Sequence, residues 1–135
     1  MQNDETDMHM DDRIYGFVLD ENTLFKIDTR KILFYSEDNF DQSIFFKAIS
    51  LNETQARLLI YLLTYRHNIV INKNDILKGV WDEFDMSSSN QRLWQTVNIL
   101  RRKLKSAGLA YDLISNERGH GYSIDGGRIK VLHIY

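Results

Sequence analysis

The sequence contains neither cysteine nor proline among its 135 residues. Without cysteine the chain can form no disulfide bond and no thiolate metal site, which fits an intracellular compartment. It also has no signal peptide and no apolar run of roughly 18 residues, so we expect no membrane-spanning segment. These absences exclude disulfide-rich secreted domains and membrane-spanning helical proteins, and we expect a cytoplasmic protein.

Hydrophobic residues make up 43% of the chain and aromatic residues 12%. A chain of this length and composition can bury one hydrophobic core, so we expect one folded domain. The first 13 residues differ, because they carry five acidic side chains, one arginine and no apolar periodicity. We therefore predict a disordered acidic leader over residues 1–13.

The net charge of the chain is -2, yet residues 89–107 contain five basic residues and no acidic one. The five are Arg92, Arg101, Arg102, Lys103 and Lys105. Helices on an ordinary solvated surface mix both signs, because oppositely charged pairs one turn apart stabilise them. The overall charge argues against a promiscuous nucleic-acid binder, whereas this segment has a basic character of its own.

Four short apolar runs precede the first helical pattern, namely "YGFVL", "LFKID", "KILFY" and "IFFKAISL". Polar turns such as "DENT" separate them, which is typical of antiparallel hairpins. We predict a four-stranded antiparallel sheet over residues 15–51.

Three helical patterns follow the strands. The first begins after Asn52, with Gln55 at the position of a capping-box partner. The second begins after Asn72, with Asp75 three residues later. The third and longest covers residues 89–107.

The region after the third helix reads as β structure. Gly108 is a natural helix end. In "YDLISNERGHGYSI" two short apolar strands flank a loop with Gly119 and Gly121, which predicts a hairpin. "RIKVLHIY" then predicts an extra strand within residues 126–135.

At 100° per residue the third helix has two opposite stripes. The apolar stripe is Leu93, Val97, Leu100 and Leu104. The polar stripe is Gln91, Gln95, Asn98, Arg102 and Lys105. Amides suit base edges in the major groove, whereas cations suit phosphates. The alternative is a plain polar helix whose last cations complement the helix dipole and need no ligand.

Four motifs together resemble one family. They are an L-T/N-x-x-Q/E opening to the first helix, Leu followed by V-W closing the second, V-x-x-L-R-x-K-L in the third, and R-G-x-G-Y in the hairpin. They lie at Leu51–Gln55, at Leu77 with Val80–Trp81, at Val97–Leu104 and at Arg118–Tyr122. The sequence resembles the OmpR/PhoB-type winged-helix DNA-binding domain, and within it the CadC/ToxR-like regulators that lack a receiver domain.

The resemblance implies an α+β fold, a winged helix-turn-helix with an N-terminal four-stranded antiparallel sheet, three helices and a C-terminal hairpin wing. The domain would span residues 14–125. It further implies a sequence-specific transcriptional regulator of double-stranded DNA, an activator, with helix 89–107 in the major groove and wing 115–122 at the minor groove.

The resemblance also assigns site residues. The base-facing positions would be Gln91, Arg92, Gln95, Thr96 and Asn98. Arg101 and Arg102 match positions that contact DNA, mainly phosphate, and Lys105 adds a cation on the same stripe. Arg118 matches the wing arginine at the minor groove.

Further partners follow from the same resemblance. The loop "DEFDMSSSN" occupies the position that contacts RNA polymerase in related activators. Two copies would bind a direct repeat as a homodimer. We expect no cofactor and no enzymatic activity, because the chain shows no nucleophile–base pair and no metal-ligand spacing among its four histidines.

The sequence departs from the family in two places. Many relatives carry two adjacent basic residues where this chain has Asn98 and Ile99, and Glu117 lies beside the wing arginine. Both changes weaken phosphate binding. They are compatible with an alternative function, a winged-helix protein-interaction module that has lost DNA binding. The extra C-terminal strand is compatible with dimerisation.

We expect Trp81 in the core and Trp94 against the neighbouring loop or a partner.

Overall fold

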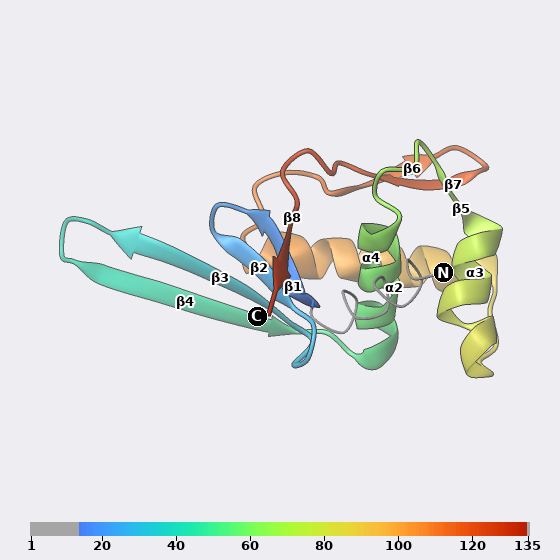
Figure 1. Cartoon of the computed structure of the whole chain (residues 1–135), viewed down its shortest axis with the longest axis horizontal. Helices are drawn as coiled ribbons and strands as arrows, with labels where there is room; N and C mark the ends of the chain where they lie inside the picture. Colours follow the sequence, from blue (N-terminus) through green and yellow to red (C-terminus); the bar gives the residue numbers. More distant parts are fainter. Residues whose placement is uncertain (1–13, 135) are drawn as a thin grey trace, which may run out of the picture.

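The structure, a computed structural model, describes residues 14–134. The acidic leader predicted for residues 1–13 lies outside them. The described residues form two antiparallel sheets and three α-helices around one hydrophobic core (Figure 1). This is the α+β winged-helix architecture that the sequence predicts. None of the helices in this part of the chain is both long enough and apolar enough to cross a bilayer.

The larger sheet has five strands in the order β4-β3-β2-β1-β8, and every neighbouring pair is antiparallel. The strands are β1 (Ile14–Asp20), β2 (Thr23–Lys26), β3 (Lys31–Asp38), β4 (Ser43–Ser50) and β8 (Lys130–His133). The first four are the predicted strands. The extra C-terminal strand joins them by pairing with β1, so the sheet is one strand wider than the predicted four-stranded sheet.

Alternation along the strands places one face of this sheet on the core. Phe17, Phe25 and Ile32 lie opposite one another on neighbouring strands and are at most 3% exposed. The β3–β4 hairpin extends beyond the helices (Figure 1). Phe45 and Phe46 of β4 are consequently 58% and 68% exposed.

Helix α2 (Glu53–Thr64) begins at the predicted capping box. The Asn52 side chain accepts a hydrogen bond from the Gln55 backbone N–H at 2.8 Å, and the Gln55 side chain accepts one from the Asn52 N–H at 3.0 Å. These bonds satisfy two backbone donors that a helix start otherwise leaves unpaired. The core-facing leucines of α2 are Leu58, Leu59, Leu62 and Leu63.

Helix α3 (Lys73–Val80) begins after Asn72, as predicted, but the cap bond differs. The Asn72 side chain accepts from the N–H of Asn74 at 2.8 Å rather than from that of Asp75. A cap side chain can reach either of these donors, and here the nearer one is used. A short 3-10 helix η1 (Asp82–Phe84) follows Trp81, which is only 1% exposed and belongs to the core.

Helix α4 (Asn90–Ala107) matches the third predicted helix. The Ser89 hydroxyl caps its start by accepting from the Arg92 N–H at 3.0 Å. Gly108 ends it with φ of 105°, a left-handed conformation that costs glycine little. Together α3 and α4 form the helix-turn-helix.

The smaller sheet forms the wing, with β5 (Ile71–Asn72), β6 (Ile114–Glu117) and β7 (Gly121–Ile124) in the order β5-β7-β6. A Cβ atom at Gly121 would collide with the carbonyl oxygen of Ile71. Glycine at this position therefore allows β7 to approach β5. The pairing connects the wing to the segment that leads into α3.

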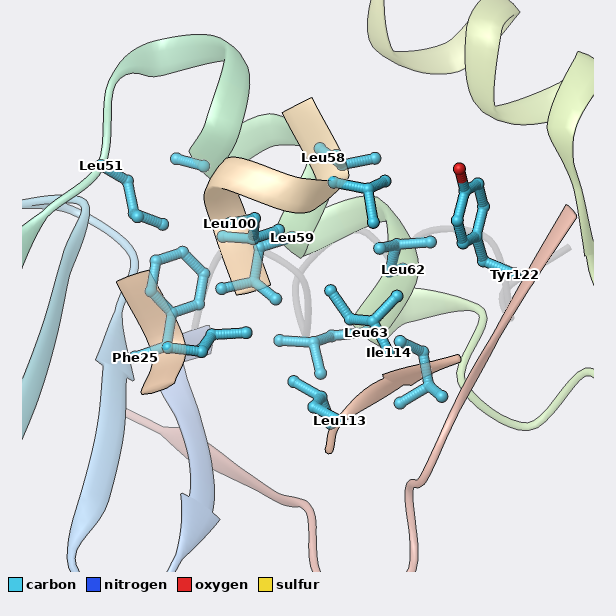
Figure 2. Packing of buried hydrophobic residues seen from close by; sticks show 14 of the residues in the cluster. Phe25, Leu51, Leu58, Leu59, Leu62, Leu63, Leu100, Leu113, Ile114 and Tyr122 are labelled. Carbon is cyan, nitrogen blue, oxygen red and sulfur yellow. The ribbon is translucent and has the colours of Figure 1, made fainter. Parts of the chain in front are cut away.

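The core lies where the sheet, the helices and the wing meet. Figure 2 shows the α2 leucines between Phe25 of the larger sheet and Ile114 and Tyr122 of the wing. Leu100 of α4 packs among them and is fully buried. Both sheets therefore share one core with α4, which holds this helix in a defined position relative to the wing.

Candidate nucleic-acid interface

Helix α4 buries the predicted apolar stripe. Leu93, Val97, Leu100 and Leu104 are between 0% and 3% exposed. The opposite side of the helix is thereby turned away from the core. Between residues 89 and 107 it carries no acidic side chain.

The predicted site residues on α4 fall into two groups by exposure. Five are exposed, namely Gln91, Arg92, Gln95, Arg102 and Lys105. Three are half-buried, namely Thr96, Asn98 and Arg101. The amides of the exposed group lie in the first half of the helix and two of its cations in the second half.

Two of the predicted base-facing residues bind their own chain in this structure. The Arg92 guanidinium donates to the Ser87 carbonyl oxygen at 3.0 Å, across the loop that precedes α4. The Thr96 hydroxyl donates to the Arg92 carbonyl oxygen at 2.8 Å. Both side chains therefore lie along the helix start, whereas Gln91 and Gln95 are exposed beside them.

Arg101 connects α4 to the wing. Its Nε atom donates to the Ile114 carbonyl oxygen at 3.2 Å, and its Nη2 atom donates to the Asn116 side-chain oxygen at 2.6 Å. Its Nη1 atom donates to the side-chain oxygen of Asn98, one turn earlier on α4, at 3.1 Å. This guanidinium also lies near Tyr122, where burial raises the pKa of the phenol and the cation opposes that rise.

The wing presents Arg118 at its tip. Arg118 and the next two residues connect β6 to β7 and are all exposed. Gly119 has φ of 74°, which a tight tip requires and glycine tolerates. The adjacent Glu117 carboxylate accepts a hydrogen bond from the Ser123 hydroxyl at 2.8 Å. This acid is therefore bound across the hairpin, while Arg118 is exposed.

A groove of about 490 Å³ separates the first turns of α4 from the wing. Gln91 and Trp94 line it from the helix, Arg118 and His120 from the wing tip, and Lys73 from α3. Trp94 is 55% exposed, so it is not a core residue. The first turns of α4 and the wing tip thus border one concave surface, to which α3 and the wing each contribute one cation, Lys73 and Arg118.

A comparison with protein families agrees with this geometry. The family described as "Transcriptional regulatory protein, C terminal" matches residues 47–124, which is more than half of the chain. The chain belongs to this family, the OmpR/PhoB-type DNA-binding domains. Members of this family are DNA-binding transcription regulators.

Two solved structures of the OmpR/PhoB-type fold resemble the chain. The DNA-binding domain of E. coli CadC has a TM-score of 0.66 and 16% sequence identity, over 89% of this chain and 99% of that one. The DNA-binding domain of E. coli CpxR has a TM-score of 0.56 and 16% identity, over 80% and 94%. At this level of identity they show the fold alone. No curated protein sequence matches the chain.

The sequence pattern does not predict the structural roles of two residues around α4, Asn116 and Lys103. Asn116 accepts a bond from Arg101, and nothing in the sequence pattern points to it. Lys103, one of the five basic residues, does not lie on the exposed face. Its Nζ atom donates to the Ser50 carbonyl oxygen and to the Gln55 side chain. Both contacts join elements that lie far apart in the sequence.

The loop between α3 and α4 is held from α2. The Arg57 guanidinium lies 3.7 Å from the centre of the Phe84 ring and donates to the Val80 carbonyl oxygen at 3.2 Å. Phe84 is nevertheless 50% exposed, and Met86 is 37% exposed. This loop therefore presents apolar side chains beside α4. Within residues 14–134, no three histidine or acidic residues gather in a way that would hold a metal ion.

Proposed function

We propose that the protein is a sequence-specific regulator of double-stranded DNA that activates transcription in the bacterial cytoplasm. The observation that carries the proposal is the outer side of α4. It combines exposed amides and cations with a complete absence of acids, opposite a fully buried apolar stripe. An acidic side chain on this surface would meet the negative field of the duplex, so its absence matters if a polyanion binds there.

In the proposed complex α4 enters the major groove and the wing lies at the adjacent minor groove. Gln91 and Gln95 are the exposed amides, and they would read base edges. Arg102, Lys105 and Arg118 would bind phosphates or the negative minor groove. The proposed interface also includes four residues that are half-buried or bound to their own chain, namely Arg92, Thr96, Asn98 and Arg101.

Activation would proceed through the loop of residues 82–90. Its exposed Phe84 and Met86 lie next to the recognition helix, so RNA polymerase bound beside the site could reach them. Two copies would occupy a direct repeat. Because each copy offers few phosphate-binding cations, single-site affinity should be modest and salt-dependent, and tandem binding would raise it.

The test of DNA recognition is selection of bound duplexes from a random pool. We expect a recovered motif that contains two half-sites in the same orientation, about 10 base pairs apart. Arg102→Glu should abolish selection, whereas Lys130→Glu on β8 should leave the motif unchanged. A pool that stays random with the unsubstituted protein would refute the proposal.

The test of activation uses a promoter that carries the selected site. Glu83→Lys in the loop should lower transcription by RNA polymerase while DNA affinity stays the same. An equal loss of both would mean that the loop acts through DNA binding alone. Unchanged transcription would exclude this loop as the polymerase contact.

A second candidate function is a protein-interaction module. The observation in its favour is the exposed apolar hairpin, where Ile44, Phe45 and Phe46 are each more than half exposed. Selection separates the two candidates, because a module that has lost DNA binding would recover no motif. The acid-free side of α4 favours the regulator.

A further inference from the structure

We infer that Arg101 is a positioning residue, which orients the amides of Asn98 and Asn116 so that both present hydrogen-bond donors to DNA. The inference rests on the proposed function, because it concerns how that same interface reads its site. It differs from a phosphate-binding role for this arginine. The sequence pattern alone favours the phosphate role, and the contacts of the side chain favour the positioning role.

The side chain of Arg101 is directed into the protein's own structure. Three of its five N–H donors bind the Ile114 carbonyl, the Asn116 amide and the Asn98 amide, at 3.2, 2.6 and 3.1 Å. One acceptor lies on α4 and two lie on the wing strand β6. A single planar group therefore connects the two elements that would enter the two grooves.

These contacts fix which end of each amide points toward Arg101. A guanidinium donates only, so the atom facing it must be the carbonyl oxygen of the asparagine and not the amino group. The Nδ2 amino group lies on the other branch of the same planar amide. Asn116 is exposed and Asn98 is half-buried, so both amides border the protein surface. Each thereby offers two N–H donors while its oxygen is engaged.

A donor is selective among the base edges of the major groove. Guanine offers two adjacent acceptors, O6 and N7, and thymine offers O4. Adenine offers only N7, beside an amino group, and cytosine offers an amino group alone. An asparagine that recognises adenine in the bidentate way needs a free oxygen as well as a free amino group. With its oxygen directed toward Arg101, Asn98 should favour a keto base, guanine or thymine. Asn116 would donate to a phosphate or sugar oxygen beside the wing.

The decisive variant is Arg101→Lys, which keeps the positive charge but cannot bind three acceptors in one plane. Arg30→Lys, at an exposed arginine in the turn between β2 and β3, is the matched control. If Arg101 positions the two amides, Arg101→Lys should lower the ratio of specific to nonspecific affinity by about tenfold. The salt dependence of binding should stay near that of the unsubstituted protein. Arg30→Lys should change neither quantity.

A phosphate role gives a different result. Lysine would then replace arginine with little loss, and Arg101→Lys would keep the specificity ratio of the unsubstituted protein. Arg101→Ala would in that case lower the salt slope by about one. Either result would overturn the positioning role.

Selection from a random pool tests the donor directly. The motif of Asn98→Ala should lose its preference at one position where the unsubstituted protein selects guanine or thymine. Adenine or cytosine at that position, or an identical motif for both proteins, would overturn the inference. A pool that yields no motif with the unsubstituted protein would instead refute the proposed function.

The amide contacts can be observed in the free protein. Side-chain NH₂ resonances of Asn98 and Asn116 should both shift in Arg101→Lys, since both oxygens lose the same partner. Resonances of Asn74, whose backbone N–H donates to the side chain of the cap residue Asn72, should not move. Unchanged Asn98 and Asn116 resonances would exclude the contacts whatever the protein does on DNA.

Discussion

The Nζ atom of Lys103 lies 2.7 Å from the side-chain oxygen of Gln55. The same ammonium donates to the Ser50 carbonyl oxygen at 2.9 Å, and the same amide oxygen accepts from the N–H of Asn52. One cation of α4 thus joins the end of β4 to the capping box of α2. Lys103 therefore contributes to the fold, although it belongs to the basic segment of residues 89–107.

Lys103→Met should therefore destabilise the protein without changing how it binds DNA. Hydrogen bonds to a charged group contribute about 1.5–3 kcal/mol, so we expect a loss in that range. Urea unfolding measures it. The control is Lys105→Met, whose exposed ammonium should contribute less than about 0.5 kcal/mol to stability but lower the salt slope by about one. The reverse pattern for the two lysines would contradict the assignment.

The two lysines, Lys103 and Lys105, show which features a sequence pattern can predict. Helices, caps and the apolar stripe depend on neighbours within a few positions, so Asn52, Asn72 and Leu100 lie where periodicity and capping rules place them. The helical projection places Lys105 on the polar stripe and leaves Lys103 off it, but it does not show what Lys103 binds. Its partners Ser50 and Gln55 are about fifty residues away in the chain.

The wing and the fifth strand also depend on contacts between residues that lie far apart in the sequence. Alternation predicts that a final strand exists, but not that it pairs with β1 across more than a hundred residues. The contact of Arg101 with Asn116 likewise requires the hairpin to be placed against α4 before it can be recognised. The base-facing role of Gln91 and Gln95 remains a prediction, supported by their exposure on the outer side of that helix.

Arg102→Ala and Arg118→Ala should each weaken binding to all sequences alike. Both side chains are exposed, one on α4 and one at the wing tip, and the acid next to Arg118, Glu117, accepts a hydrogen bond from Ser123 instead. Loss of one phosphate contact should lower the slope of log affinity against log salt by about one. Fluorescence anisotropy at several salt concentrations measures this, with Lys130→Ala as the control. A slope that stays at its original value would remove that arginine from the interface.

Gln95→Ala should change sequence preference and leave the salt slope intact. The amide is uncharged and exposed at the centre of the outer side of α4, so its removal affects base contacts only. Discrimination at one base position should fall by about 1–3 kcal/mol. Competition between duplexes that differ at single positions measures the change. If Gln95→Ala binds every competitor as the unsubstituted protein does, this residue reads no base.

Gly108→Ala should destabilise the junction between α4 and the larger sheet. Its φ of 105° is unfavourable for alanine, and the added Cβ would lie 2.8 Å from the Phe34 ring. We expect a loss of about 1–2 kcal/mol from the backbone alone. Gly127→Ala is the control, because nothing lies within 4 Å of its added Cβ. Equal thermal stability of the two variants would show that the helix end adapts.

Tyr111 should make stability fall at alkaline pH. The Tyr111 hydroxyl donates to the Leu19 carbonyl oxygen at 2.7 Å. Burial is the largest cause that raises the pKa of this phenol from about 10 to about 12, the nearby acids Asp125 and Asp20 contribute to the rise, and Arg128, which lies over the ring, opposes it.

The direction of the effect follows from proton linkage. Between pH 10 and pH 12 the unfolded chain releases the Tyr111 proton while the folded chain keeps it, so stability decreases as pH rises. The contribution is complete below about pH 10 and is lost through about pH 12. Tyr111→Phe removes this titration together with one hydrogen bond of about 1 kcal/mol. The variant should be less stable at pH 8 and should lose stability less steeply above pH 10, because Tyr61 and Tyr122, whose pKa values burial also raises, still titrate. Urea unfolding at intervals of half a pH unit measures both effects, and identical alkaline slopes for the two proteins would mean that the Tyr111 proton is not held by the fold.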